Sequence, residues 1–212
     1  METVNNVSCI VNRPGGFIIT DRAIGFCSFP SDAKILDLGC GFGATVDHLV
    51  KNHGLESVGL DPKEEPSNPN IIKASAEQIP FQNATFDGVL MECSFSVVEN
   101  QETALKECHR VLKTDGRLII SDMYARGEGA LLEGCLGRVD IKEEIFSRLE
   151  NNGYAIDLFE DFSDHLKAMW GQLIFDKGAK SFYCELGVTP EVMKRIKCGY
   201  FLIVASKSNQ QR

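Results

Sequence analysis

Three glycines at alternate positions, Gly39, Gly41 and Gly43, lie between an apolar run and a helix-like segment in the stretch ILDLGCGFGATVDHL. When a strand runs through such glycines into a helix, a ligand can approach the backbone where a Cβ would clash. The helix N-terminus then directs unpaired N–H groups and a partial positive charge at the ligand. This stretch therefore predicts a site for a nucleotide-like cofactor.

Two carboxylates accompany the glycines. Asp61 lies twenty-two residues after Gly39, at the end of the next predicted strand, where it can accept hydrogen bonds from ribose hydroxyls. The letters GCGFGA fit both the dinucleotide pattern GxGxxG/A and the GxGxG pattern of methyltransferases, so the glycines alone leave both cofactors open. Asp37, just before the loop, would repel a pyrophosphate but suits the ammonium of an amino-acid-bearing cofactor.

Strands and helices alternate along the chain, which is typical of an α/β fold with a parallel sheet and right-handed crossovers. Seven strands are predicted, at KILDL, ESVGLD, NIIKAS, TFDGVLME, RLIISD, YAIDLFED and YFLIVASK, and we expect the last two to pair as a hairpin-like edge. Helices are predicted at TDRAIGFCSF with Thr20 or Asp21 as N-cap, ATVDHLVKNHG, ETALKECHRVLK, IKEEIFSRLENNG after a capping box of Asp140 and Glu143, SDHLKAMWGQLIFDKG, and TPEVMKRIKCG with Thr189 as N-cap.

Length and composition indicate one domain over residues 1–212, without room for a dehydrogenase's second domain. The net charge of -8 and the lack of a dense basic cluster argue against nucleic acid and favour a small molecule or a protein as partner.

No apolar run approaches the length of a membrane span, and the N-terminus lacks a secretory signal, so a cytoplasmic location is expected. The oligomeric state is left open.

Eight cysteines are scattered along the chain without a CxxC pair. In a chain without a secretory signal this pattern predicts free thiols, and the spacing is not that of a structural zinc site. We therefore expect no disulfide and no metal.

Residues 30–122, and more loosely the rest of the chain, resemble the class I S-adenosylmethionine-dependent methyltransferases. ILDLGCGFG looks like their first motif, VGLDP their second-strand motif, ASAEQIPFQNATFDGVLMECSFSVVEN their cofactor loop and fourth strand, and ALKECHRVLKTDGRLIISD their helix and fifth strand. The resemblance implies a doubly wound, Rossmann-like, seven-stranded sheet with helices on both faces and an antiparallel last strand. Residues 30–122 would then be the cofactor half and 123–212 the substrate half, with 1–29 as an N-terminal lid.

The resemblance also implies a set of cofactor-binding positions: Asp37, Gly39, Cys40, Gly41, Gly43, Asp61, Pro62, Ser75, Ala76, Glu77 and Glu92. In this scheme Asp37 and the glycine loop hold the methionine moiety, and Asp61 binds the ribose. Ala76 and Glu77 lie beside the adenine. Ser75 stands where family members often carry Asp, so its contact to the adenine amino group is weaker.

Methyl transfer from a sulfonium is an in-line displacement that depends mainly on alignment, so no catalytic triad is required. Glu92 and Cys93 are expected to face the sulfonium and the acceptor, and the substrate-side candidates are Cys93, Ser94 and Tyr124. The histidines, His48, His53, His109 and His165, are not placed as bases. The glycine-rich segment at 123–139 is a second candidate lid.

The function predicted from the sequence is S-adenosylmethionine-dependent methyl transfer to a small molecule. Its first alternative is a thiol or metalloid methyltransferase, motivated by the cysteines. Its second is a non-catalytic protein that binds S-adenosylmethionine, motivated by Ser75 and the lack of an obvious base. A nicotinamide-dependent oxidoreductase is a remote third.

Overall fold

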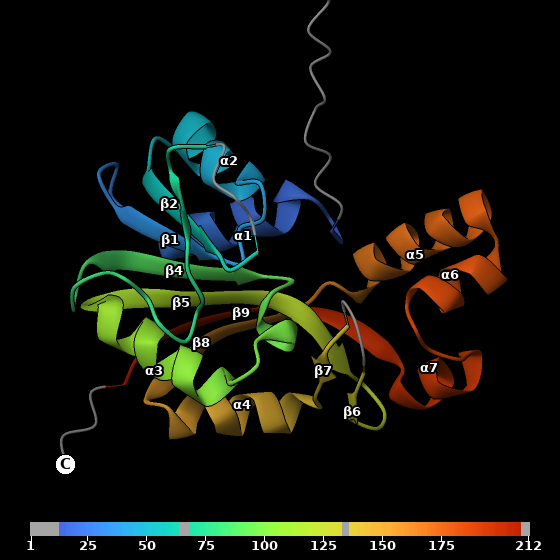
Figure 1. The fold of residues 1–212 in the computed structure, drawn as a ribbon. Coiled ribbons are helices and arrows are strands. Elements are labelled where there is room, and N and C mark those ends of the chain that lie inside the picture. Colours follow the sequence, from blue (N-terminus) through green and yellow to red (C-terminus); the bar gives the residue numbers. More distant parts are fainter. Residues whose placement is uncertain (1–12, 64–67, 133–135, 209–212) are drawn as a thin grey trace, which may run out of the picture.

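One mixed sheet of seven strands organises the molecule, in the order β3-β2-β1-β4-β5-β9-β8 (Figure 1). The computed structural model describes residues 13–63, 68–132 and 136–208. The strands span Lys34–Leu38 (β1), Glu56–Asp61 (β2), Ile71–Lys73 (β3), Phe86–Glu92 (β4), Leu112–Ala125 (β5), Tyr154–Asp161 (β8) and Cys198–Lys207 (β9).

The last strand runs against its neighbours. Strand β9 pairs antiparallel with β5 on one side and with β8 on the other, whereas β1, β2, β3, β4 and β5 pair parallel. The predicted seven-stranded α/β fold with an antiparallel last strand is therefore confirmed, and so is the predicted pairing of the last two strands.

Helices cover both faces of the sheet (Figure 1). Helices α1 (Phe17–Cys27) and α2 (Ala44–His53) lie on one face, and α3 (Gln101–Val111) and α4 (Lys142–Asn151) lie on the other. Helices α5 (Ser163–Lys177), α6 (Ala179–Glu185) and α7 (Pro190–Ile196) follow β8 and lie to one side of the sheet in the figure. A short 3₁₀ turn, η1 (Phe95–Val97), follows β4, and β6 (Ala130–Leu131) and β7 (Arg138–Val139) form a separate two-stranded sheet.

The two faces divide the core into two apolar clusters. Because successive strand residues point to opposite faces, Leu36 and Leu38 of β1 pack on the α3 and α4 side, while Ile35 packs on the α1 and α2 side. In β4 the same alternation places Met91 with the first cluster and Leu90 with the second. Asp37 and Glu92 therefore belong to the α1 and α2 face.

Some predicted boundaries were wrong. Helix α1 begins at Phe17 after Gly16, so Thr20 and Asp21 lie inside the helix and Thr20 is buried. Helix α4 begins after Ile141 with no side-chain cap, because Asp140 instead accepts a hydrogen bond from Nη1 of Arg148 at 2.5 Å. Tertiary pairing thus overrode both capping predictions.

Two elements had not been predicted. Helix α6 and the β6–β7 hairpin lack strong periodicity, and the hairpin lies within the glycine-rich segment predicted as a lid. Residues 1–12 of the predicted N-terminal lid, and 133–135 of this segment, lie outside the described residues. In the described part of the chain, every helix is too short or too polar to cross a membrane.

Candidate cofactor site

A cleft of about 390 Å³ opens beside the carboxyl ends of β1, β2 and β4. Parallel α/β sheets bind ligands at this edge. The cleft is lined by Leu38, Gly39, Asp61, Pro62, Lys63, Ser75, Ala76, Glu77, Met91, Cys93, Ser94, Val97, Val98 and Glu99. It is large enough for a cofactor-sized molecule.

The glycine loop passes from β1 into α2 through left-handed backbone. Gly39 has φ of +73° and donates its N–H to the carbonyl oxygen of Leu60 at 2.8 Å. A Cβ at Gly39 would lie 2.5 Å from the Cβ of Ser94, so a larger residue would displace a side chain that lines the cleft. Gly43, with φ of +84°, is the N-cap of α2. The loop geometry therefore requires glycine at both positions.

Asp61 ties the end of β2 to the loop. Its Oδ2 accepts a hydrogen bond from the N–H of Gly41 at 3.0 Å, and its Oδ1 accepts one from the N–H of Lys63 at 2.9 Å. A carboxylate offers two acceptor oxygens, and the two hydroxyls of a ribose are donors of matching number. Asp61 lines the cleft, as a ribose-binding carboxylate must.

The structure brings many of the predicted residues together. Gly39, Asp61, Pro62, Ser75, Ala76 and Glu77 all line the cleft, and so do the substrate-side candidates Cys93 and Ser94. Cys40, Gly41 and Gly43 belong to the same loop without lining the cleft. Cys40 instead packs on Gly59, where an added Cβ would lie 2.5 Å from its sulfur.

Glu92 takes a different position from the predicted one. It does not line the cleft but points to the α1 and α2 face, where its Oε1 accepts from Thr20 Oγ1 at 2.8 Å and its Oε2 from Thr45 Oγ1 at 3.0 Å. Arg13 forms an ion pair with Glu92, with Nη1 2.7 Å from Oε2. The pleat explains this position, since Met91 faces the cleft and its neighbour faces away.

Asp37 is buried on the same face as Glu92. Burial, and then the nearby carboxylate of Glu92, raise the pKa of Asp37 to about 8, while Arg13 opposes this shift. A cation placed beside a carboxyl group lowers the pKa of that group, so an ammonium next to Asp37 would favour the carboxylate anion. This fits the predicted role beside an ammonium, although Asp37 does not line the cleft.

Cys93 and Tyr124, two of the three substrate-side candidates, keep their protons at neutral pH and so are not available as bases. Burial raises the pKa of the Cys93 thiol to about 12, and its sulfur lies 3.0 Å from the hydroxyl oxygen of Tyr200. The residue as a whole is exposed, but the protein atoms packed around the thiol govern its ionisation. Tyr124 does not line the cleft; its hydroxyl donates to Asp161, and its pKa is also raised to about 12, chiefly by burial.

None of the four histidines is among the described residues that line the cleft. His109 lies on α3 and His165 on α5, while His48 and His53 contact Asp21. The described part of the cleft thus contains no imidazole.

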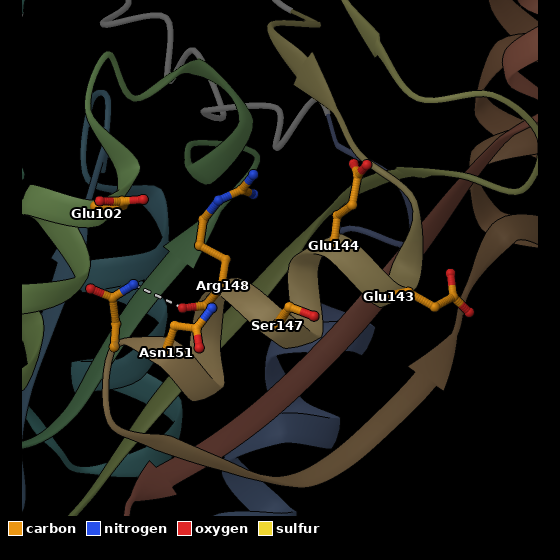
Figure 2. A pocket seen from close by; sticks show the side chains of 7 residues that line it. Glu102, Glu143, Glu144, Ser147, Arg148 and Asn151 are labelled. Atoms are coloured by element: carbon orange, nitrogen blue, oxygen red, sulfur yellow. Dashed lines mark hydrogen bonds between the residues drawn. The ribbon is translucent and has the colours of Figure 1, made fainter.

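A second cavity, of about 360 Å³, lies between α3 and α4 and is lined by Glu102, Glu143, Glu144, Ser147, Arg148, Asn151 and Asn152 (Figure 2). The guanidinium group of Arg148, which lines this cavity, already forms an ion pair with Asp140. Figure 2 shows that Glu102 comes from α3, and that the labelled side chains of α4 spread apart along the helix and do not converge on one point. This cavity carries no recognisable chemistry.

Sequence reasoning assigned no role to Val97, Val98 and Glu99, which follow β4 and line the cleft. Asp122, within β5, holds this turn by accepting a hydrogen bond from the N–H of Ser96 at 2.8 Å. Burial raises the pKa of Asp122 to about 6, and its backbone hydrogen bonds oppose the shift. The sequence did offer a signal for this role of Asp122, because the predicted strand RLIISD ends on this carboxylate.

The segment from β1 to β5 matches a known family. The family described as a methyltransferase domain matches residues 36–120, which contain the glycine loop, Asp61 and the cleft. Over these residues the chain is similar to that family, in the region where its motifs resemble those of the class I S-adenosylmethionine-dependent methyltransferases.

The relatives of this chain differ in the acceptor that their names give. An uncharacterized protein of Haemophilus influenzae is 30% identical over 131 residues, which are 54% of this chain and 52% of that protein. The chain thus spans about half the length of this relative. Other relatives, 23% to 29% identical, are named as N-, C- and O-methyltransferases.

Solved structures share the fold. The phosphoethanolamine N-methyltransferase 2 of Haemonchus contortus, in complex with phosphomonomethylethanolamine and S-adenosylhomocysteine, superposes with a TM-score of 0.71 at 16% identity, over 93% of this chain and 54% of that one. The [4+2]-cyclase SpnF superposes with a TM-score of 0.67 at 19% identity, over 90% of this chain and 80% of that one. This fold therefore serves more than one reaction.

Proposed function

We propose that the protein transfers the methyl group of S-adenosylmethionine to a small molecule whose acceptor atom is already nucleophilic at neutral pH. The observation that carries the proposal is the cleft at the carboxyl ends of β1, β2 and β4, where Gly39, Asp61 and Cys93 meet. An amine is the acceptor class to test first.

The residues of the cleft fit the cofactor. Asp61 offers a carboxylate to a ribose, and Ser75 and Ala76 offer a part of the same cleft wall to an adenine ring. Gly39 gives the methionine chain close access to the backbone. Bound S-adenosylmethionine would supply a methyl group on a positively charged sulfur.

The reaction needs alignment more than proton transfer. The lone pair of the acceptor attacks the methyl carbon, and the carbon–sulfur bond breaks with its electron pair staying on sulfur. The products are the methylated acceptor and S-adenosylhomocysteine, and a protonated amine product loses its proton to water. Holding the two reactants in line is the contribution expected of the protein.

The ionisable groups in the cleft support an acceptor that needs no base. Cys93 keeps its proton at neutral pH because its pKa is about 12, and histidines do not line the described cleft. A hydroxyl acceptor would require a base to remove its proton. An amine in its neutral form, a carbanion-like carbon or a free thiolate already carries the attacking lone pair and would not require one.

The alternatives receive less support. Cys93 is the only cysteine among the described residues that line the cleft, whereas a metalloid substrate calls for several thiols. The family match argues against a nicotinamide cofactor. A non-catalytic protein that binds S-adenosylmethionine differs from an enzyme only in whether methyl transfer occurs.

The test has two steps. Calorimetry compares S-adenosylmethionine, S-adenosylhomocysteine and NAD as ligands of the full chain, and binding of the first two but not of NAD is expected. The protein is then incubated with methyl-labelled S-adenosylmethionine and pools of small amines, thiols and phenols. Label transferred to amines supports the proposal. Tight binding without transfer to any pool would favour the non-catalytic alternative, and transfer to phenols alone would contradict the acceptor class.

A further inference from the structure

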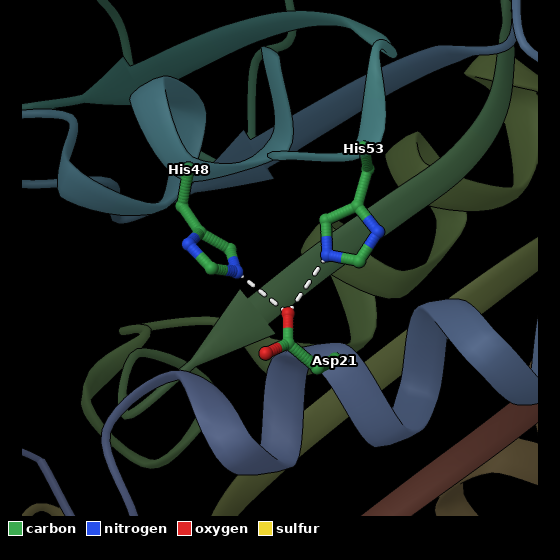
Figure 3. A group of neighbouring side chains, drawn as sticks. All are labelled: Asp21, His48 and His53. Atoms are coloured by element: carbon green, nitrogen blue, oxygen red, sulfur yellow. Dashed lines mark hydrogen bonds and ion pairs between the residues drawn. The ribbon is translucent and has the colours of Figure 1, made fainter. Parts of the chain in front are cut away.

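A histidine-rich cluster lies outside the cofactor cleft, between α1 and α2. Asp21 projects from α1, and His48 and His53 project from α2 (Figure 3). Nε2 of His48 lies 2.6 Å from Oδ1 of Asp21, and Nε2 of His53 lies 2.7 Å from the same oxygen. All three atoms lie within 4.8 Å of one another.

We propose that Asp21, His48 and His53 bind a divalent transition metal ion such as Zn²⁺. Two imidazole nitrogens and one carboxylate oxygen are ligands that this class of ion prefers. Three protein ligands leave one position of a tetrahedral site for water.

The geometry needs only a small adjustment. Ligand atoms about 2.0 to 2.1 Å from a tetrahedral ion lie roughly 3.3 Å from one another. The two nitrogen-to-oxygen distances, 2.6 and 2.7 Å, must therefore open by about 0.6 Å. Asp21 can make this movement because its side chain is 48% exposed.

Neighbouring groups orient the His48 ring. Its ring stacks on Phe17, with centroids 3.8 Å apart, and its Nδ1 lies 2.8 Å from the side-chain amide of Asn52. Histidine ligands usually present their other ring nitrogen to such a partner. If the Asn52 amide turns over, its oxygen accepts a hydrogen bond from the Nδ1–H of His48, and the lone pair of Nε2 can then bind the metal.

The site connects two helices that also meet beneath the cofactor loop. Thr20, the residue before Asp21, and Thr45, in the first turn of α2, both donate to Glu92. The cluster bridges the outer surfaces of the same two helices. A metal there would clamp α1 onto α2 and thereby stabilise the support of the glycine loop, a structural role distinct from methyl transfer.

The sequence did not reveal this cluster. His48 and His53 are five residues apart on α2, and Asp21 is far from both in the chain, so no short ligand motif is present. The packing of α1 on α2 brings the three side chains together.

Metal binding is tested on the full chain after treatment with a chelator. The thiols are first blocked with iodoacetamide, because Cys184 is exposed and thiols also bind zinc. Zn²⁺ alone is titrated by calorimetry, and Co²⁺ is titrated by visible absorption to report tetrahedral coordination. We expect one equivalent of each ion to bind and Zn²⁺ to raise the melting temperature.

The variants Asp21→Asn and His53→Gln should each weaken Zn²⁺ binding by at least about 100-fold and abolish the rise in melting temperature. His48 is left in place because it stacks on Phe17. His165→Gln, on α5, is the matched control and should bind as the wild type does. Circular dichroism of each metal-free variant checks that it folds. A wild-type protein that binds no Zn²⁺, or binding that either variant leaves unchanged, would overturn the proposal.

Discussion

Arg13 Nη1 lies 2.7 Å from Glu92 Oε2, and the two side chains are only 12% and 3% exposed. The pair joins the segment before α1 to the end of β4. Since the same carboxylate also accepts from Thr20 and Thr45, one buried charge holds α1 and α2 to the sheet.

Removing either partner of this pair should destabilise the fold. Arg13→Met or Glu92→Gln leaves a buried charge uncompensated, so each should lower the free energy of unfolding by about 3 to 5 kcal/mol, measured by urea denaturation. The double variant should lose less than the sum of the single losses. Arg22→Met breaks the more exposed pair with Glu160 and is the control. If Arg13→Met costs no more than this control, the pair is not a structural anchor.

Asp61→Asn should weaken binding of S-adenosylmethionine. The amide keeps one acceptor oxygen but cannot accept from two ribose hydroxyls and from Gly41 and Lys63 together, so a loss of about 1 to 3 kcal/mol is expected. Calorimetry measures this loss. Asp115→Asn, an exposed carboxyl on β5, should bind as the wild type does. Equal affinity in both variants would remove Asp61 from the cofactor site.

The raised pKa of Asp37 makes stability depend on pH. Between its ordinary value of 3.8 and its folded value of about 8, the folded state binds more protons than the unfolded state. The free energy of unfolding contributed by this group is therefore fully present below pH 4 and is lost as the pH rises through about 8.

Asp37→Asn removes this dependence because an amide does not titrate. The stability of the variant relative to wild type should rise by more than about 1 kcal/mol between pH 5 and pH 9, measured by denaturant titration at each pH. Asp32→Asn, an exposed carboxyl before β1, should show a nearly constant difference. A constant difference for Asp37→Asn as well would contradict the raised pKa.

Cys93→Ala tests whether the thiol acts as a base. Because the thiol has a pKa of about 12, it should stay protonated, and kcat should fall by less than about tenfold. The measurement is the initial rate with the acceptor found by the labelled-methyl assay, and Cys184→Ala is the control at an exposed position. A loss of more than about 100-fold, together with unchanged cofactor affinity, would assign Cys93 a catalytic role.

Gly39→Ala should affect both stability and cofactor binding. The new Cβ would meet the Cβ of Ser94 at 2.5 Å in a backbone with φ of +73°. Gly54→Ala is a matched control, because Gly54 has φ of +66° but no neighbour within 4 Å of the added atom. The control should cost roughly 1 to 3 kcal/mol from backbone strain alone and leave cofactor affinity unchanged.

Gly39→Ala should cost more stability than this control and also weaken S-adenosylmethionine binding, both measurable by thermal unfolding with and without the cofactor. If the two variants lose the same stability and bind equally, Ser94 does not constrain the loop.

The sequence by itself determined the alternation of strands and helices, the glycine loop and the placement of Asp61 at the same edge of the sheet. These features depend on local periodicity and on motifs that follow consecutive parallel strands, and the carboxyl ends of such strands must meet. The positions of Ser75 and Glu77 and the antiparallel direction of β9 came from the family resemblance rather than from periodicity.

Only the tertiary structure decided which way Glu92 points, that Arg13 neutralises it, that Tyr124 donates to Asp161, and that Asp21 meets two histidines. The physical reason is that strand pleat and helix packing set these side-chain directions through contacts between residues far apart in the chain. In β4, Met91 lines the cleft, whereas the next residue, Glu92, lies on the opposite face of the sheet and binds α1 and α2.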